Sequence, residues 1–428
     1  MSKNVSFLTL GCAKNESDSA RMQEDLIRAG YSIVDIADSA DVIVVNTCSF
    51  IQSAIEESLD TVFEIAGYDS VASGDTKLVV CGCMPSRFGD DLEEELTEAD
   101  KFVTCREEDN IVETIDELLG VSSVRNSVEV DFGYAPSEYV KISDGCNRFC
   151  SFCTIPFIRG RYHSFSYDEI ASDVKAKVES GTKEIVLIAQ YSGIWGLDLK
   201  PRENLASLLK RLSEAYPDTW FRVMYLQPAG MTDELLDVMA AHDNICNYFD
   251  IPLQHCDSEI LKSMNRSGSR AEYEQMVARI RQRIPGIALR TTLIVGYPGE
   301  TEEQFDDLCD FVSETEFDYV GIFAYSPEDG TPAAELPNQV DEDTKQARLQ
   351  ELRDIADAVS SHVVSRRIGT SMDVLVLGCE EDGQLYGRAQ CQAPDVDGVT
   401  YLEHGAVGEL HTVSISDTLL YEMEALGD

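Results

Sequence analysis

The stretch DGCNRFCSFCTIP, residues 144–156, carries three cysteines in the spacing C-x3-C-x2-C, at Cys146, Cys150 and Cys153. Thiolates are the usual protein ligands of iron–sulfur clusters, and a loop that supplies only three of them leaves the fourth iron open to another ligand. With 13 cysteines in 428 residues, a chance triplet of this spacing is expected only about 0.01 times. We therefore predict a reactive iron–sulfur cluster here, with these cysteines as candidate catalytic residues.

The sequence around this loop alternates between apolar runs and amphipathic stretches. Six candidate strands begin at residues 139, 184, 220, 248, 289 and 319, and the cysteine loop directly follows the first. Helical patterns separate them, at 167–180, 204–215, 232–241, 270–283 and 301–315. Six consecutive βα units predict an incomplete (β/α)6 barrel over residues 131–365. By analogy with full barrels, the chemistry is expected on the loops that follow the strands.

Residues 1–130 repeat a different arrangement, in which a short apolar strand ends at a cysteine. The three instances are VSFLTLGC, DVIVVNTC and KLVVCGC, which end at Cys12, Cys48 and Cys83. Apolar runs that alternate with helical patterns, such as residues 18–29, predict an open parallel α/β sheet covered on both faces. Because ligands bind at the carboxyl ends of the strands in such sheets, all three cysteines should lie along one edge.

Residues 366–428 change to short strands with frequent glycines, as in MDVLVLG, GQLYGRAQ, VTYLEHG and ELHTVSISD. This pattern predicts a small closed antiparallel β-barrel. The segment has three arginines against twelve Asp and Glu residues, a net charge of -9. It is therefore poorly suited to binding the phosphates of RNA.

The composition as a whole is that of a folded, acidic protein. Lys and Arg number 34 against 78 Asp and Glu, a net charge of -44. This charge favours a basic protein partner, although it could serve solubility alone. Neither a signal peptide nor an apolar run of membrane-spanning length is present, so we expect a cytoplasmic location without membrane association. In that compartment an odd number of cysteines favours ligation of a cluster or metal over a disulfide framework.

Several stretches resemble the radical S-adenosylmethionine (SAM) enzymes, whose motif is C-x3-C-x-aromatic-C, with Phe152 in the aromatic place. The likeness extends to the methylthiotransferase branch through KISDGCNRFCSFCTIPFIRG, FDIPLQHCDSEILKSMNR and RTTLIVGYPGETEEQF, and through LGCAKN and NTCSFIQSA near the amino terminus. In that family the three segments are a cluster-binding amino-terminal domain, a radical-SAM core and a TRAM β-barrel. The residue patterns by themselves predict the same three-part division.

The resemblance implies two 4Fe–4S clusters. One, at Cys146, Cys150 and Cys153, would bind and reduce SAM with electrons from an external donor, giving a radical that abstracts hydrogen from an unactivated carbon. The other, an auxiliary cluster, would be held by Cys12, Cys48 and Cys83 and would carry the sulfur. Phe152, Gln190 and Arg266 are candidate cofactor-binding residues. Cys81 could rival Cys83, and we interpret the other cysteines as packing or incidental residues, namely Cys105, Cys246, Cys256, Cys309, Cys379 and Cys391.

Two branches of the family differ in substrate. One modifies an aspartate of small-subunit ribosomal protein twelve, and the other an adenosine of transfer RNA. The acidic segment 366–428 favours the ribosomal protein, and the sequence IPLQH, which ends at His255, resembles the ribosomal-protein branch. On that protein the enzyme would place a methylthio group at the β-carbon of the aspartate. The transfer-RNA reading, a non-catalytic iron–sulfur electron-transfer or sensor protein, and zinc ligation remain alternatives.

Overall fold

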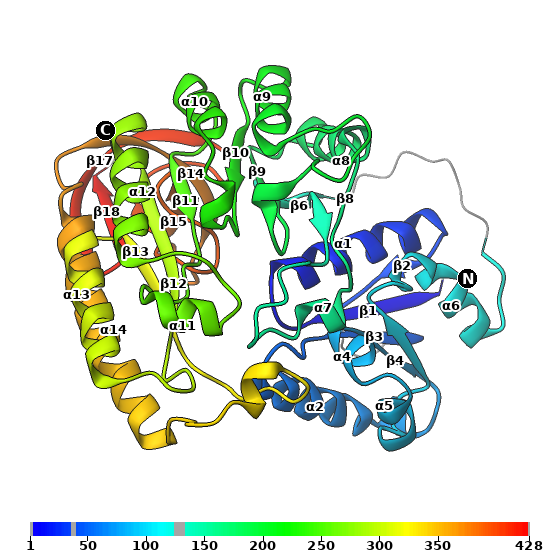
Figure 1. Cartoon of the computed structure of the whole chain (residues 1–428). Helices are drawn as coiled ribbons and strands as arrows, with labels where there is room; N and C mark the ends of the chain where they lie inside the picture. Colours follow the sequence, from blue (N-terminus) through cyan, green and yellow to red (C-terminus); the bar gives the residue numbers. More distant parts are fainter. Residues whose placement is uncertain (1–2, 36–39, 124–132, 427–428) are drawn as a thin grey trace. The chain divides into compact units, whose positions relative to one another are not determined.

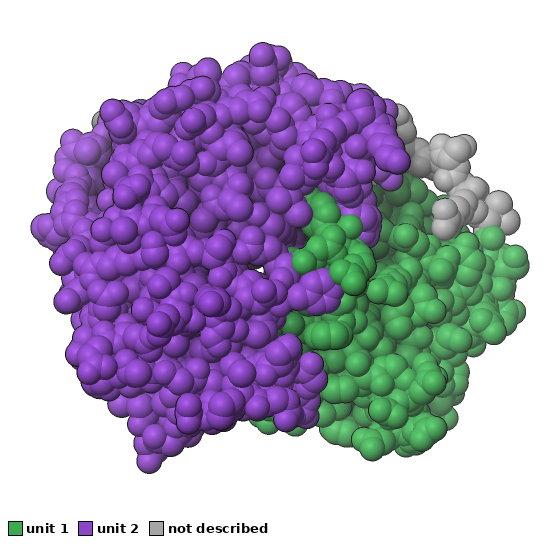
Figure 2. Space-filling model, in the orientation of Figure 1, with its two compact units in different colours: residues 1–132, 144–147, 153–162 green, residues 133–143, 148–152, 163–428 purple. Residues whose placement is uncertain are grey.

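The computed structural model describes residues 3–35, 40–123 and 133–426. The chain divides into two compact units, coloured separately in Figure 2. Unit 1 comprises residues 1–132, 144–147 and 153–162. Unit 2 comprises residues 133–143, 148–152 and 163–428. The cysteine loop at residues 146–153 is thus divided between the two units.

Unit 1 is built on a five-stranded parallel sheet with the strand order β2-β1-β3-β4-β5 (Figure 1). Its strands are β1 (Asn4–Thr9), β2 (Ser32–Ile33), β3 (Val42–Thr47), β4 (Lys77–Gly82) and β5 (Lys101–Thr104). Its helices are α1 (Ala13–Arg28), α2 (Gln52–Ala66), α3 (Asp69–Ala72), α4 (Cys83–Phe88), α5 (Asp90–Glu95), η1 (Glu108–Asn110), α6 (Ile111–Leu119) and α7 (Ile155–Ile158).

Both faces of this sheet are covered, as the unbroken apolar runs predict. Successive side chains of a strand point to opposite faces. In β3, Val42 and Val44 pack into a cluster with residues of α1 and α6. Ile43 and Val45 pack into a second cluster with residues of α2, α4 and α5. The strand is buried along its whole length.

Unit 2 contains the six expected strands as two three-stranded parallel sheets, in the orders β10-β9-β6 and β11-β12-β13. An isolated parallel bridge joins Phe221 of β10 to Ile245, three residues before β11 begins. The strands are β6 (Ser137–Lys141), β9 (Glu184–Ile188), β10 (Trp220–Val223), β11 (Tyr248–Asp250), β12 (Ala288–Val295) and β13 (Tyr319–Ala324). This partial barrel of parallel strands agrees with the predicted fold class.

Helices connect these strands in sequence. They are α8 (Tyr167–Glu179), α9 (Leu205–Ala215), α10 (Asp233–Ala241), α11 (Ser258–Ser263), α12 (Arg270–Arg283), α13 (Glu302–Thr315) and α14 (Glu342–Ser365), with short 3-10 turns η2 (Ser192–Ile194), η3 (Pro228–Gly230) and η4 (Pro332–Glu335). The two-residue strands β7 (Ser143–Asp144) and β8 (His163–Ser164) lie where the chain changes unit. Five predicted helices are confirmed to within one residue at each end.

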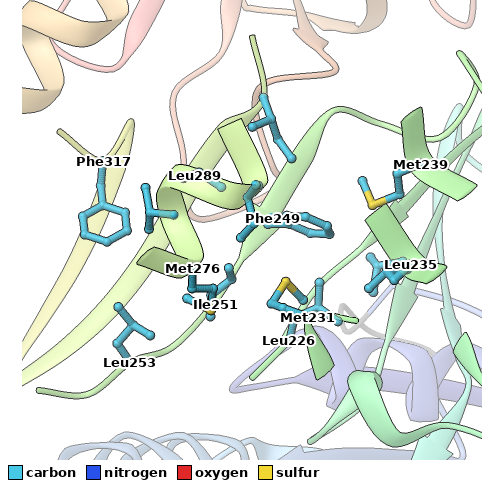
Figure 3. Packing of buried hydrophobic residues seen from close by; sticks show 14 of the residues in the cluster. Leu226, Met231, Leu235, Met239, Phe249, Ile251, Leu253, Met276, Leu289 and Phe317 are labelled. Carbon is cyan, nitrogen blue, oxygen red and sulfur yellow. The ribbon is translucent and has the colours of Figure 1, made fainter. Parts of the chain in front are cut away.

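A large cluster of buried apolar residues packs between the strands and helices of unit 2 (Figure 3). Phe249 of β11, Leu289 of β12 and Ile251, which directly follows β11, pack there against helix residues such as Leu235 and Met276. Burial of this kind contributes about 25 cal/mol per Å² of apolar surface. The packed interior holds the strand ends, and hence the loops that follow them, in fixed positions.

The carboxyl-terminal strands close into a barrel with the order β14-β15-β16-β18-β17. They are β14 (Ser371–Cys379), β15 (Leu385–Ala389), β16 (Thr400–Leu402), β17 (Leu410–Leu419) and β18 (Glu422–Leu426). The barrel is antiparallel except for β16 and β18, which pair in parallel. Strands β2, β5 and β18 were not predicted from the sequence, β2 because it has only two residues.

Buried ion pairs attach this barrel to the rest of unit 2. Glu184 of β9 contacts both Arg222 of β10, at 2.8 Å, and Arg388 of β15. Burial alone would raise the pKa of Glu184, but the two guanidinium groups hold it at about 2. The carboxylate therefore stays ionised at neutral pH and joins the two parts of the unit.

The predicted three-domain partition, 1–130, 131–365 and 366–428, remains a prediction. Its first boundary lies outside the described residues, and the two-unit division keeps residues 366–428 with the central segment. No helix in the described part of the chain combines the length and the apolar character needed to cross a membrane.

Candidate active site

Cys12, Cys48 and Cys83 follow the carboxyl ends of β1, β3 and β4. These strands are neighbours in the sheet of unit 1 and run parallel. The predicted arrangement along one edge is therefore present, although the residues are far apart in sequence. Cys12 is exposed, whereas Cys48 and Cys83 are buried.

The side chain of Asn15 lies among these strand ends. Its Oδ1 is 4.0 Å from the Sγ of Cys12 and 3.8 Å from the Sγ of Cys83. Its Nδ2 donates hydrogen bonds to the carbonyl oxygens of Leu10, at 3.0 Å, and Thr47, at 2.9 Å. Asn15 thus connects the loop after β1 to the end of β3 while facing two of the three thiols.

Two glycines allow the strand ends that carry the cysteines to lie close together. Gly11 has φ +101°, and a Cβ there would lie 2.8 Å from the Cβ and 3.1 Å from the Sγ of Cys48. Gly82 has φ +91°, and a Cβ there would lie 2.2 Å from the Oδ1 of Asn46 and 2.8 Å from the carbonyl oxygen of Thr47. Only glycine adopts such a backbone in so little space. Both therefore belong to the construction of this edge.

The structure distinguishes Cys83 from its neighbour Cys81. Cys81 is completely buried within β4 and packs among apolar residues of the α1 and α6 face. Burial raises the pKa of its thiol well above the ordinary value, as for a structural cysteine. Cys83 begins α4 at the strand end, beside Asn15, so the preference for Cys83 agrees with this geometry.

A fourth cysteine lies at the same edge. Cys105 follows β5, the strand next to β4, and its thiol lies beside that of Cys83. Interaction with the Cys83 thiol and burial raise the pKa of the Cys105 thiol well above its ordinary value. Cys105 was interpreted from the sequence as a packing or incidental residue, and β5 was not predicted. The strand-then-cysteine signal in KFVTC, residues 101–105, could have found it.

Cys146 and Cys153 of the loop triplet belong to unit 1. The backbone N–H of Cys146 donates to the carbonyl oxygen of Gly160 at 3.1 Å. Gly145, with φ +74°, lies so close to Arg161 that a Cβ would be 2.4 Å from its carbonyl oxygen. The returning chain at residues 160–161 therefore fixes the backbone that leads into Cys146.

Cys150 belongs to unit 2, where Arg266 faces it. Nη1 of Arg266 is 3.7 Å from the Sγ of Cys150, and Nη2 donates to the carbonyl oxygen of Pro252 at 2.7 Å. The next residue, Ser151, donates from Oγ to the carbonyl oxygen of Ser263 at 2.8 Å. The guanidinium is thus fixed beside a candidate cluster ligand.

The other candidate cofactor-binding residues are also in unit 2. Phe152 packs against a cluster that includes Met264 and Tyr297, so its ring supports the loop. Gln190 follows β9, and among the described residues its buried Oε1 has no hydrogen-bond partner. A buried polar atom without a partner is costly and commonly marks a place where a ligand binds.

Within residues 3–35, 40–123 and 133–426, no three His, Cys, Asp or Glu side chains form a group that could hold a single metal ion. A four-iron cluster is larger than one ion, so its ligands lie farther apart. The thiols at the strand ends of unit 1, the glycines that make space beside them, and the free Oε1 of Gln190 are compatible with an iron–sulfur cofactor and a polar ligand.

Three family descriptions match successive parts of the chain. Residues 4–104 match the uncharacterized protein family UPF0004, residues 140–312 match the Radical SAM superfamily, and residues 368–426 match the TRAM domain. These ranges fall in the amino-terminal sheet, the six-strand segment and the carboxyl-terminal barrel.

Curated relatives align over nearly the whole chain. The ribosomal protein uS12 methylthiotransferase RimO of Clostridioides difficile (strain 630) is 38% identical over 439 residues, covering 99% of this chain and 98% of that protein. The protein of the same name from Syntrophus aciditrophicus (strain SB) is 40% identical over 419 residues, covering 94% and 92%.

Among solved structures, the radical S-adenosylmethionine methyltransferase TsrM from Kitasatospora setae, with cobalamin and a 4Fe–4S cluster bound, has a TM-score of 0.58 and 15% identity. The match covers 78% of this chain and 74% of that chain. At this identity the likeness concerns the fold alone.

Proposed function

We propose that this chain, which belongs to the ribosomal protein uS12 methylthiotransferase family of radical SAM enzymes, transfers a methylthio group to the β-carbon of an aspartate in small-subunit ribosomal protein uS12. The relatives and the match to the Radical SAM superfamily confirm the family resemblance and the expectation of an enzyme. The name of the relatives favours the ribosomal protein over transfer RNA as the substrate.

As a member of this superfamily the chain uses SAM and an iron–sulfur cluster. When bound, they supply the abstraction of a hydrogen atom from an unactivated carbon, which no side chain performs alone. The chain's own residues hold and orient these groups. In the proposal, Cys146, Cys150 and Cys153 ligate this cluster, Arg266 keeps a positive charge beside Cys150, and Gln190 offers its free carbonyl to SAM.

The presence of two clusters is the next part of the proposal. Cys12, Cys48 and Cys83 would hold the auxiliary cluster, since they converge on Asn15 and Gly11 at one edge of the sheet. Three ligands leave one iron open. Sulfur destined for the substrate would be held there, at an edge where Gly11 and Gly82 allow the close approach of the backbone.

One structural observation supports a protein, rather than a nucleic acid, as the substrate. All three arginines of residues 366–428 contact carboxylates of unit 2. Arg366 pairs with Glu316 at 2.6 Å, Arg367 with Asp318, and Arg388 with Glu184. A nucleic-acid-binding surface needs cations that can neutralise phosphates, and these three guanidinium groups are already engaged.

The barrel also has an acidic groove. Five of its lining residues are acidic: Glu380, Glu381, Asp382, Glu403 and Glu424. Such a surface repels phosphate and attracts a basic ribosomal protein, chiefly by accelerating association at low ionic strength. We also propose that the enzyme acts in the cytoplasm, where ribosomal proteins are made, with an external electron donor.

The substrate proposal is tested in cells that lack the gene, complemented with the wild-type chain or with Cys150→Ala. Mass spectrometry of uS12 should show the methylthio mass on an aspartate only with the wild-type chain. Nucleoside analysis of transfer RNA from the same cells should show no difference. An unmodified uS12 in wild-type cells, with a transfer-RNA methylthio group that depends on the gene, would reject the proposal.

A further inference from the structure

Arg159 is a buried cation in unit 1. It follows α7, only six residues after Cys153, and its side chain is 2% exposed. One of its partners is Asp18 of α1, whose side chain is 1% exposed. Burial alone would lower the pKa of Arg159, but Asp18 and the neighbouring thiols raise it well above the ordinary value, so the guanidinium is charged.

The ion pair with Asp18 engages only part of this guanidinium. Nη2 donates to the Oδ1 of Asn15 at 2.9 Å and lies 3.7 Å from the Sγ of Cys83. Asn15 is the residue whose Oδ1 also faces Cys12. Arg159 therefore brings a cationic donor to the point where the strand-end thiols converge. Asp144, at 3.7 Å from Nη1, is a second, more distant carboxylate.

We propose that Arg159 is a positioning residue of the auxiliary site, whose N–H donor to the Cys83 sulfur raises the reduction potential of the cluster bound there. This inference rests on the proposed function, because it takes Cys83 as a cluster ligand. Hydrogen bonds to cluster sulfurs and nearby charge are known determinants of cluster potential. A positive charge stabilises the more negative, reduced state, and the effect is strong where water is excluded.

If the ion pair had only a structural role, we would expect a different pattern of changes in the reduction potential. If Arg159 only tethered residues 153–162 to α1, removing Arg159 or removing Asp18 would have the same effect on the reduction potential of the cluster. If its charge acts on the cluster, the two changes act in opposite directions. Arg159→Gln removes the cation and should lower the potential, whereas Asp18→Asn removes the opposing anion and should raise it.

The measurement uses the full chain with Cys146, Cys150 and Cys153 replaced by Ala, so that only the auxiliary site can bind a cluster. After anaerobic reconstitution, iron and sulfide are quantified, and the midpoint potential is determined by spectroscopic redox titration. Arg159→Lys keeps the charge and should give a potential between those of the wild-type residue and Gln. Arg21→Gln, a partly exposed arginine of α1 that pairs with Asp109, is the control and should leave the potential unchanged.

We expect a more negative potential for Arg159→Gln and a more positive one for Asp18→Asn, each with iron content close to that of the parent. Equal potentials in all variants that retain the cluster would overturn the role of Arg159. If Arg159→Gln fails to fold, Arg159→Lys and Asp18→Asn still test the role of Arg159. A shift of the midpoint potential in the same direction in both of these variants would also overturn that role. If the parent with Arg159 intact binds no cluster, the auxiliary site itself is rejected, and this inference is rejected with it.

Discussion

The two cysteine triplets of this chain are assembled by different means. Cys146, Cys150 and Cys153 lie within one loop of eight residues, whereas Cys12, Cys48 and Cys83 are separated by 36 and 35 residues. The second triplet comes together because β1, β3 and β4 are neighbouring parallel strands. The loop triplet therefore depends on local backbone geometry, and the strand-end triplet depends on the order and stability of a sheet. Changes to that sheet should affect the two sites unequally.

The largest expected difference comes from removing one thiol of each triplet. Cys150→Ala should abolish the release of 5'-deoxyadenosine from SAM. Cys48→Ala should leave that release in place but abolish methylthio transfer to uS12. In each variant the iron content should fall from about eight to about four atoms per chain. Both products are measured by chromatography after anaerobic reconstitution, with the wild-type chain as the reference.

The opposite pattern would break this assignment. If Cys48→Ala lost 5'-deoxyadenosine while Cys150→Ala kept it, the roles of the triplets would be reversed. If zinc alone were found in the wild-type chain, the cluster proposal would fail for both.

The next effect comes from Gly82, which precedes Cys83. Gly82→Ala places a Cβ 2.2 Å from the Oδ1 of Asn46 at φ +91°, and such strain costs on the order of 1–3 kcal/mol. We expect a lower melting temperature and loss of iron from the strand-end site, with 5'-deoxyadenosine release retained. Gly74→Ala is the matched control, because its φ is +80° and nothing lies within 4 Å. Equal loss of iron in both variants would show that the contact with Asn46 is unimportant.

A smaller effect is expected from Asn15→Ala. The change removes the donor to the carbonyl oxygens of Leu10 and Thr47 and leaves buried groups without a partner, at a cost of about 1–3 kcal/mol. Urea unfolding should report the loss of stability, and iron should dissociate faster from the strand-end site than in the wild-type chain. The exposed Asn110→Ala serves as the control. An unchanged rate of iron loss would show that Asn15 does not help to hold iron at the strand-end site.

Cys105→Ser should have the smallest effect. Cys105 lies beside Cys83, but the proposal assigns three ligands and gives Cys105 no ligand role. Iron content and methylthio transfer should stay within about twofold of the wild-type chain. A loss of about four irons per chain would instead identify Cys105 as a ligand. The strand-end site would then have four cysteine ligands and the loop site three.

The sequence by itself determined most elements and both triplets. The spacing of Cys146, Cys150 and Cys153 is local, and the βα alternation predicted the six strands and five of the helices because periodicity follows from which side chains are buried. The recurring strand-then-cysteine pattern also located Cys12, Cys48 and Cys83, since parallel strands end at the same edge of a sheet.

Only the tertiary structure decided which groups face these thiols. The sequence KFVTC places Cys105 directly after β5, but its position beside Cys83 follows only from β5 being the neighbour of β4 in the sheet. The contact of Arg159 with Cys83 joins residues 76 positions apart, and that of Arg266 with Cys150 joins residues 116 apart. No local pattern encodes such pairs, because they arise when separate elements pack together.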